Sequence, residues 1–270
     1  MKQGENLYLI DEICKEKGIE ESFLSLGWIR ELRKDGKICH IVRNSFDLNP
    51  SSCYHIVNDK YATYEVLKHH NISVLTHYIL FNPNAEGRGE FAGNLSEEVD
   101  EIFNKINQEK LVVKANTSSE GKQVFIVNSR TEAIQVIQEL FRENFLSVSI
   151  CPFEEIECEY RVVFLDNEIL YVYKKIARDW KHNLADGARA ETNLENDEKL
   201  EEVKQLALRA GKVTNARFVT IDISKRTNGE IFVMEINGAV CMSKFIETVE
   251  NGREIARKIY EKAIDKMFDK

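Results

Sequence analysis

Four polar residues lie within two largely apolar runs, at the spacing expected of two paired strands. The segment 218–237 reads FVTIDISKRTNGEIFVMEIN, and an Asn-Gly pair at 228–229 separates its two apolar runs. Such a pair between β-rich runs is a strong hairpin signal. If these two residues form the turn, four polar side chains share one face of the hairpin, in two cross-strand pairs. The pairs are Asp222 with Glu235 and Thr220 with Asn237.

Two carboxylates directly opposite each other on adjacent strands repel, so the pair needs an explanation. On a solvated outer face the repulsion is screened, and the pair would then have no function. Alternatively, a divalent cation binds between them. The oxygen ligands of Asp222, Glu235 and Asn237 suit Mg²⁺ or Mn²⁺ better than zinc. Because Mg²⁺ usually binds one or two carboxylates together with substrate phosphates, this interpretation requires a phosphate site nearby.

A candidate phosphate site lies in the segment 111–127, LVVKANTSSEGKQVFIV. Two β-rich runs enclose small polar residues, among them Ser118, Ser119 and Gly121, which leave backbone N–H groups free to approach an anion. Lys114 is an unusual charge within the first run. It either ends a strand and reaches water or contacts phosphates under a mobile glycine-bearing flap. The chain has no GxxxxGK[ST] motif, so this is not a P-loop.

Composition restricts the class of protein. The chain has 270 residues, 43% hydrophobic and 30% charged, which is typical of a soluble globular protein with one large or two smaller domains. A net charge of −8 argues against nucleic-acid binding as the main function. No apolar run has the length of a membrane span. The six cysteines lack metal-finger spacing and are interpreted as reduced thiols of a cytoplasmic protein.

Periodicity and turn residues predict the remaining elements. Apolar spacing predicts six helices. Strands are expected at 23–26, at 74–80, at 146–150 and in a hairpin around Asp35 and Gly36. The segment 177–193 has neither helical nor strand periodicity and is expected to be a long loop that is either functional or disordered. The helices are expected at 6–17, from Asp59 onward, at 96–107, 131–142 and about 197–213, and at 244–270 with a break at Gly252.

A second hairpin is expected around a turn at 166–167. A two-residue turn there places Glu159 opposite Lys174 and Tyr160 opposite Tyr173.

Five segments in this order resemble the ATP-grasp superfamily, most closely RimK-type and glutathione-synthetase-like ligases. The resemblance covers roughly residues 58–240. It implies an α+β fold, in which two α+β subdomains clamp ATP behind a short N-terminal α/β segment. The implied division is 1–57 and 58–270, with a mobile lid at about 95–150. The five segments are DKYATYEVLKHHNISV, VVKANTSSEGKQVFIV, PFEEIECEYRVVFLDNEILYVYKK, HNLADG and IDISKRTNGEIFVMEIN.

The resemblance also implies site residues and cofactors, ATP and Mg²⁺ (or Mn²⁺). Lys60 and Lys114 would contact the ATP phosphates, beneath a flap that contains Ser118, Ser119 and Gly121. The hinge residues Glu154, Glu155 and Ile156 would meet the adenine, and Glu159 the ribose. Asp222, Glu235 and Asn237 would hold the metal, and Arg161, Lys174 and Asn183 would surround the reacting phosphoryl group.

The implied reaction is ATP-dependent joining of a carboxylate to an amine through an acyl phosphate, with small-molecule or peptide substrates. Two alternatives remain open: a phosphotransferase that acts on a hydroxyl, and a non-catalytic nucleotide-binding subunit. Both phosphate lysines and the metal residues are present, which argues against the subunit. A ligase needs both an acid and an amine, whereas a kinase needs one acceptor.

Departures from the family pattern concern the second substrate. After MEIN the chain continues with GAVCMSKF, where relatives carry small residues, proline and glycine. The front segment is shorter than the usual substrate domain of these ligases, so part of the substrate-binding surface is expected to be either missing or supplied by a partner. A homodimer is one hypothesis for such a partner. The basic residues between 178 and 189 favour an anionic substrate, such as a glutamate-rich peptide, unless they serve the nucleotide alone.

Overall fold

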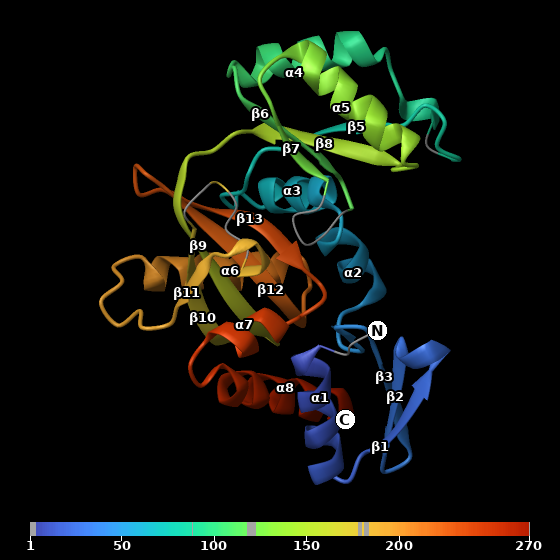
Figure 1. Ribbon diagram of the computed structural model, residues 1–270, viewed down its shortest axis with the longest axis vertical. Coiled ribbons are helices and arrows are strands. Elements are labelled where there is room, and N and C mark those ends of the chain that lie inside the picture. Colours follow the sequence, from blue (N-terminus) through green and yellow to red (C-terminus); the bar gives the residue numbers. More distant parts are fainter. Residues whose placement is uncertain (1–3, 88, 118–122, 178–179, 181–183, 270) are drawn as a thin grey trace.

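Three antiparallel sheets follow one another along the long axis of the molecule (Figure 1). This computed structural model describes residues 4–87, 89–117, 123–177, 180 and 184–269. The strand orders are β1-β2-β3-β4 in the front sheet, β11-β10-β9-β12-β13 in the central sheet and β5-β8-β6-β7 in the third. Helices and strands mix in the α+β manner expected from the sequence. None of the described helices has the length and apolarity of a membrane span.

The front sheet is built from short strands and has one buried face. Asp35 and Gly36 both have positive φ, which suits the tight turn of a two-residue hairpin and confirms the expected β2–β3 pairing. The first strand comes earlier than residues 23–26. The elements are α1 (Glu5–Glu16), β1 (Glu20–Leu24), a 3-10 turn (Ser25–Gly27), β2 (Ile29–Lys34), β3 (Lys37–Val42), β4 (Ser45–Phe46) and α2 (Ser51–Val57).

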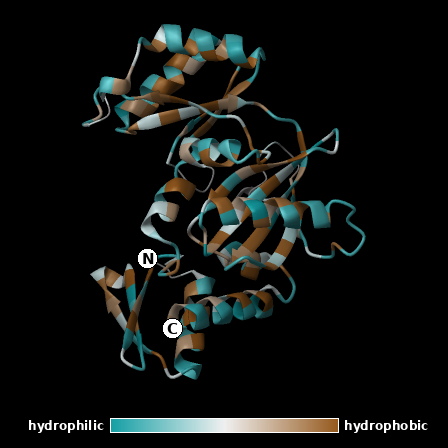
Figure 2. Ribbon diagram, turned by 180° about the vertical axis from the view of Figure 1, so that it is seen from behind, coloured by the Kyte–Doolittle hydropathy of each residue, from teal (hydrophilic) through white to brown (hydrophobic). Residues whose placement is uncertain are grey.

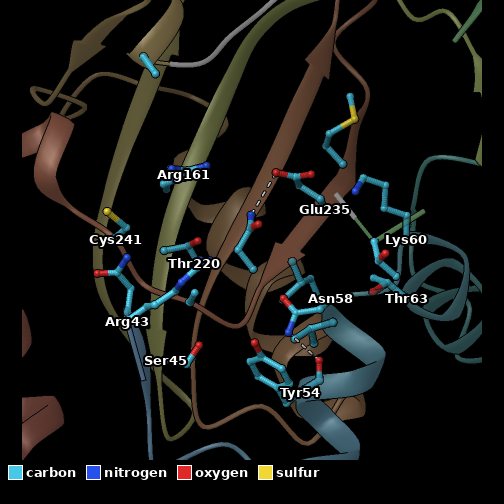
Figure 3. Close-up of a pocket in the computed structure, with 18 of the residues that line it drawn as sticks. Arg43, Ser45, Tyr54, Asn58, Lys60, Thr63, Arg161, Thr220, Glu235 and Cys241 are labelled. Carbon is cyan, nitrogen blue, oxygen red and sulfur yellow. Dashed lines mark hydrogen bonds between the residues drawn. The ribbon is translucent and has the colours of Figure 1, made fainter. Parts of the chain in front are cut away.

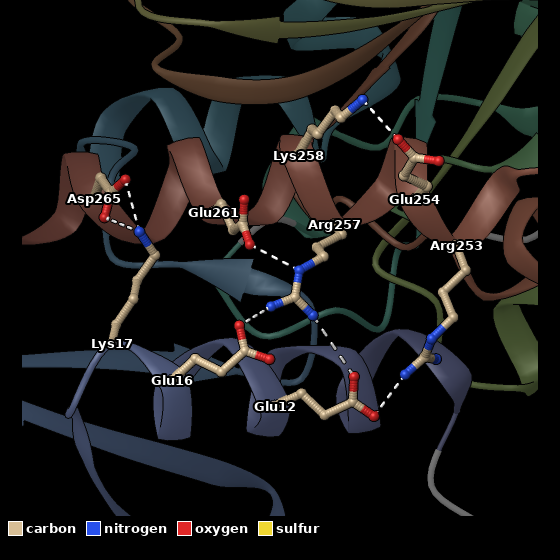
Figure 4. A network of polar contacts seen from close by, with 9 residues as sticks. All are labelled: Glu12, Glu16, Lys17, Arg253, Glu254, Arg257, Lys258, Glu261 and Asp265. Atoms are coloured by element: carbon tan, nitrogen blue, oxygen red, sulfur yellow. Dashed lines mark hydrogen bonds and ion pairs between the residues drawn. The ribbon is translucent and has the colours of Figure 1, made fainter.

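The front segment shares its core with the C-terminal helices. Leu9, Ile13 and Leu32 are fully buried in one cluster with Tyr260 and Ile264 of α8 (Gly252–Phe268), which follows α7 (Ser243–Thr248). Ion pairs border this apolar contact. In Figure 4, Arg253 and Arg257 of α8 reach the acidic side chains of α1, and Lys17 reaches Asp265 at 2.8 Å. Thus α1 and α8, far apart in sequence, form one helix pair.

The third sheet and two helices form a unit with its own core. Both helices pack on one face of the sheet, where Val113, Ile137 and Ile150 are fully buried. The side chain of Asn94 caps α4, so this helix begins one residue before Ser96. The elements are β5 (Tyr78–Phe81), a 3-10 turn (Gly89–Phe91), α4 (Leu95–Ile106), β6 (Leu111–Ala115), β7 (Val124–Val127), α5 (Arg130–Arg142) and β8 (Ser147–Pro152).

The central sheet separates an apolar layer from the polar site. Helix α6 covers one face, and Figure 2 shows apolar residues concentrated along these strands. Part of the segment expected to be a loop forms the edge strand β11, which pairs with β10. The elements are α3 (Lys60–His69), β9 (Ile156–Leu165), β10 (Glu168–Ile176), a 3-10 turn (Leu184–Asp186), β11 (Arg189–Glu191), α6 (Leu200–Val213), β12 (Phe218–Arg226) and β13 (Ile231–Asn237).

The loop of the β12–β13 hairpin is longer than expected, yet the polar residues of the hairpin pair as expected. Arg226 N–H donates to the Glu230 carbonyl, so the loop has three residues, ending at Gly229 with φ of 88°. A register shift then follows, since Ile223 pairs with Val233 while Asp222 pairs with Glu235. The extra residue, Met234, is a β-bulge. The bulge offsets the longer loop and restores the predicted pairing at the site.

The β9–β10 hairpin has no such compensation. The turn at 166–167 is confirmed, but a register shift follows between Ile169 and Tyr171. Glu159 therefore pairs with Lys175, and Lys174 pairs with Tyr160. The predicted pairing of Glu159 with Lys174 is wrong by one residue, and such a slip moves every later side chain to the other face of the sheet.

Candidate active site

Polar side chains form successive rows across one face of the central sheet. Because side chains alternate along a strand, residues at matching register positions share this face. The first row holds Lys175, Glu159 and Ser224; the second holds Tyr173, Arg161, Asp222 and Glu235; the third includes Thr220 and Asn237. The sheet thus brings together residues from four strands, which form two hairpins far apart in the sequence.

Asp222 is the centre of a buried ion-pair network. Arg161 donates through Nε at 2.8 Å and Nη2 at 2.6 Å, and Lys175 Nζ lies 3.2 Å from the same carboxylate. Lys175 also forms an ion pair with Glu159. Burial opposes ionisation of Asp222, but Arg161 and Lys175 outweigh it and lower its pKa to about 2. Burial raises the pKa of Glu159 to about 7, with Asp222 and Glu235 contributing in the same direction.

Lys174 lies on the opposite face from this network. Its Nζ is 2.5 Å from Asp197, and the ammonium stands over the ring of Tyr160. Lys175, which the sequence did not single out, is 1% exposed and occupies the place expected for Lys174. The β-bulge near residue 170 causes the exchange, and no local sequence pattern marks it.

The residues expected to hold a metal fit a hard divalent cation. Asp222 and Glu235 are Cα partners, and Asn237 Nδ2 donates to Glu235 Oε1 at 3.1 Å, which leaves the amide oxygen of Asn237 as an acceptor. All three offer oxygen atoms, as Mg²⁺ requires. Carboxylate oxygens have further lone pairs, so Asp222 can accept a cation in addition to Arg161.

Lys60 and Lys114 lie close together between the third sheet and the central sheet. Burial lowers the pKa of Lys60 to about 8, with Glu235 opposing the shift and Lys114 adding to it. His77 lies beside both lysines, and its Nδ1 is 2.5 Å from Ser149 Oγ. Burial and the two lysines hold the pKa of His77 well below 6.5, so this ring is neutral. The sequence reasoning missed His77, because one histidine just before β5 forms no motif.

Asn116 adds an unpaired donor to this corner. Its carbonyl accepts from Lys60 N–H at 3.2 Å and its Oδ1 from Tyr61 N–H at 3.0 Å, which fixes the N-terminus of α3. Its Nδ2 is buried and has no acceptor within the described part of the chain. A buried donor without a partner is costly, and a bound anion would satisfy it. The corner therefore suits a phosphate.

The hinge between β8 and β9 borders an apolar cluster between the two sheets. The cluster combines Val112 and Cys151 with Phe232, and Ile156 and Phe153 pack against it. A planar apolar ring would fit among such side chains.

The three hinge residues expected to meet the adenine differ in exposure. The Glu154 carboxylate accepts two bonds from Arg226, at 2.8 and 2.9 Å, so its side chain is already paired. Glu155 is exposed, and Ile156 is partly buried.

A cavity of ≈1060 Å³ runs from Lys60 and Glu235 to the front sheet. Figure 3 shows Glu235, Lys60 and Thr63 on one side, and Arg43, Ser45 and Cys241 on the other. Arg161, Thr220 and Asn237 also line it. Ser118, Ser119, Gly121 and Asn183, which were expected to contact ATP or the phosphoryl group, lie outside the described residues.

The chain belongs to the RimK-like ATP-grasp family, whose domain model matches residues 58–263. It is 32% identical over 148 residues to the uncharacterized protein MG011 of Mycoplasma genitalium, covering 54% of this chain and 43% of that protein. It is 29% identical over 131 residues to the coenzyme γ-F420-2:α-L-glutamate ligase of Methanocaldococcus jannaschii, covering 48% and 44%. The chain thus spans less than half the length of each of these two relatives.

Solved structures share the ATP-grasp fold. The D-alanine–D-alanine ligase of Bacillus anthracis has a TM-score of 0.62 at 19% identity, covering 83% of this chain and 70% of that one. A RiPP-associated ATP-grasp ligase of Chryseobacterium gregarium, solved with ADP and a leader and core peptide, has a TM-score of 0.59 at 14% identity, covering 96% and 93%. These likenesses confirm the fold that the sequence motifs predicted.

Proposed function

We propose that this protein is an ATP- and Mg²⁺-dependent carboxylate–amine ligase that acts on an amino acid or peptide. The observation that carries the proposal is that Lys60 and Glu235 line one cavity, with Lys114 close to Lys60 and Asp222 paired with Glu235. Among its relatives, the F420 enzyme is named a glutamate ligase and the B. anthracis enzyme a D-alanine–D-alanine ligase, and both names describe carbon–nitrogen bond formation.

The corner around Lys60 and Lys114 is the proposed phosphate site. Two ammonium groups and the Asn116 amide provide donors for phosphate oxygens, while the neutral His77 adds no further charge. The cluster beside Ile156 is the proposed adenine site, and Glu159 the proposed ribose contact. The B. anthracis ligase has been solved complexed with ATP, which agrees with a nucleotide site in this fold.

Asp222, Glu235 and Asn237 are the proposed metal ligands, and Arg161 the residue that meets the phosphoryl group. When bound, ATP would supply the phosphoryl group that converts the substrate carboxylate into an acyl phosphate, with Mg²⁺ neutralising phosphate charge. The protein's own contribution is positioning and fixed positive charge, which favour the charged transition state without a protein nucleophile. Lys175 keeps Asp222 and Glu159 oriented by its two ion pairs.

A calorimetric titration tests the nucleotide site. We expect a non-hydrolysable ATP analogue to bind with micromolar Kd in the presence of Mg²⁺, and at least tenfold more weakly after Glu235→Gln or without the metal. The substituted protein should keep its fold, because the change relieves repulsion with Asp222. If Glu235→Gln leaves both the fold and the Mg²⁺-dependent affinity for the analogue unchanged, the metal site is wrong.

A product assay tests the reaction. We expect phosphate release from ATP to require an acid and an amine together, with the amide detected by mass spectrometry. Phosphate transfer to a single hydroxyl compound would instead identify a kinase. Nucleotide binding without turnover on any pair would support a binding subunit.

A further inference from the structure

The front sheet forms one wall of the cavity that contains Glu235. The turn between β3 and β4 contributes Arg43 and Ser45 to this wall, and Trp28 lies beside them. Cys241 and Lys244, from the segment after β13, complete it. Arg43 and Trp28 precede residue 58, where the family match begins, so nothing in the family match assigns them a function.

Hydrogen bonds on three sides fix the turn that carries Arg43. Val42 pairs with Ser45, so Arg43 and Asn44 form a two-residue turn. Arg43 N–H donates to the Trp28 carbonyl at 3.1 Å, and the Asn44 carbonyl accepts from Val240 N–H at 3.0 Å. The Asn44 side chain also accepts from Asn6 Nδ2 at 2.6 Å. Val240 follows the proposed metal ligand Asn237 by three residues, so this hydrogen bond joins the turn to the chain just after the β12–β13 hairpin.

The side chain of Arg43 is held in place for binding. Its guanidinium lies over the Trp28 ring, 3.6 Å from the centroid, and this cation–π contact restricts its rotamers. Its backbone has φ of 56°, a left-handed conformation that asparagine and glycine adopt more readily than arginine. An arginine at such a position is more costly to the backbone than asparagine would be, so its side chain must provide something else.

The charges along the cavity are unevenly distributed. Among the described lining residues, Glu235 is the one carboxylate, and it lies beside Lys60 at the opposite end from Arg43 (Figure 3). Arg43 forms no ion pair with any carboxylate in the described part of the chain, and Lys244 adds a second positive charge, itself paired with Glu247. The front end of the cavity is therefore positive and suited to an anion.

We propose that Arg43, stacked on Trp28, binds a carboxylate of the substrate other than the one that reacts. The front sheet then selects an acidic amino acid, or a peptide that presents an acidic side chain or a C-terminal carboxylate. Guanidinium groups bind carboxylates through two parallel hydrogen bonds, which gives geometric selection as well as affinity. This inference rests on the proposed ligase function and names the residue that determines its substrate class.

Cys241 provides a reporter inside the cavity. It is the exposed cysteine of the chain, and the other five are buried, so iodoacetamide should alkylate it selectively. A ligand bound at Arg43 should slow this alkylation. The experiment compares wild type with Arg43→Asn, which suits the left-handed turn and should leave thermal stability unchanged or raised. Arg33→Asn, on an exposed arginine of β2 outside the cavity, is the matched control.

In wild type and Arg33→Asn, L-glutamate should slow alkylation of Cys241. If Arg43 binds the side-chain carboxylate, L-glutamine should protect at least tenfold less effectively at equal concentration. Arg43→Asn should lose at least tenfold of the protection by glutamate while binding the ATP analogue with unchanged affinity. Arg43→Lys should recover part of the protection, since it keeps the charge without the planar fork.

Two blocked peptides identify the source of the carboxylate. N-acetyl-Glu-Glu-amide offers side-chain carboxylates only, and N-acetyl-Gln-Gln offers a terminal carboxylate only. Protection by either supports the assignment and names the group. Equal protection of Arg43→Asn and wild type, or no protection by any acidic probe, would overturn it, whereas equal protection by glutamine, which keeps the α-carboxylate, would agree with N-acetyl-Gln-Gln and assign the terminal carboxylate.

The assay is run with and without nucleotide and Mg²⁺. Protection by acidic probes without any nucleotide binding would refute the ligase proposal and leave the Arg43 site standing.

Discussion

Because of the register shift in the β9–β10 hairpin, we expect substitution of Lys175, and not of Lys174, to lower the stability of the protein strongly. Replacing Lys175 with methionine leaves Glu159 buried, with Ser224 Oγ at 3.5 Å as the remaining side-chain donor among the described residues. Removing one partner of a buried ion pair costs about 3–5 kcal/mol. For a chain of this size that lowers Tm by about 5–10 °C. The measurement is thermal unfolding of the nucleotide-free protein.

Lys174→Met is the matched comparison. Its partner Asp197 keeps hydrogen bonds from the Tyr160 hydroxyl at 3.0 Å and from Lys199 N–H at 2.9 Å, so the loss should be near 1 kcal/mol. Adding Glu159→Gln to Lys175→Met should restore much of the lost stability, because the unpaired charge is gone.

The deficit of Lys175→Met should also depend on pH. The pKa of Glu159 is already raised to about 7 from 4.5 in the folded state, and it rises further without Lys175. The folded state then binds more protons than the unfolded state above pH 4.5, so stability falls as pH rises through the folded pKa. The Tm deficit should be larger at pH 8 than at pH 5.5. A larger loss for Lys174→Met than for Lys175→Met would refute the register and the network.

Three further outcomes are expected. Lys60 loses its proton as pH rises through about 8, so affinity for the ATP analogue should fall above that pH in calorimetric titrations, and Lys60→Arg should remove this dependence. Gly211→Ala places a Cβ 2.5 Å from the Phe164 ring, and this overpacking should cost about 1–3 kcal/mol in chemical denaturation, whereas Lys212→Ala should cost little. Arg257→Ala removes solvent-accessible ion pairs between α1 and α8, so the loss of stability should be at most about 1 kcal/mol and should shrink in high salt.

Sequence reasoning succeeded where a local pattern and the tertiary structure agree. The Asn-Gly pair predicted the hairpin and the pairing of Asp222 with Glu235, although the loop has three residues and a bulge at Met234 corrects the register. The predicted pairing at the site is therefore correct only because the bulge at Met234 cancels the effect of the longer loop on the register. The second hairpin had one uncompensated bulge, and the prediction slipped by one residue there.

The residues that were missed share a physical cause. β-bulges are selected by packing across the whole sheet, which a single segment does not encode. His77 and Arg43 acquire their surroundings from segments more than 70 and nearly 200 residues away, respectively, through Ser149 and Val240. Motifs report local chemistry, whereas the wall of a cavity depends on which distant segments the fold brings together.

The pairing of α1 with α8 has a consequence for how the cavity forms. Contacts such as Arg253 with Glu12 join residues 241 positions apart, so the loop they close is long and its closure is slow. During synthesis, the apolar stripe of α1 would remain uncovered until α8 has been made. The turn that carries Arg43 belongs to the same front segment as α1, which packs on α8 only after α8 has been made. The proposed phosphate site around Lys60 and Lys114 would thus form before the cavity wall that contains Arg43. Until then the front sheet would be exposed and would be the part that a chaperone binds.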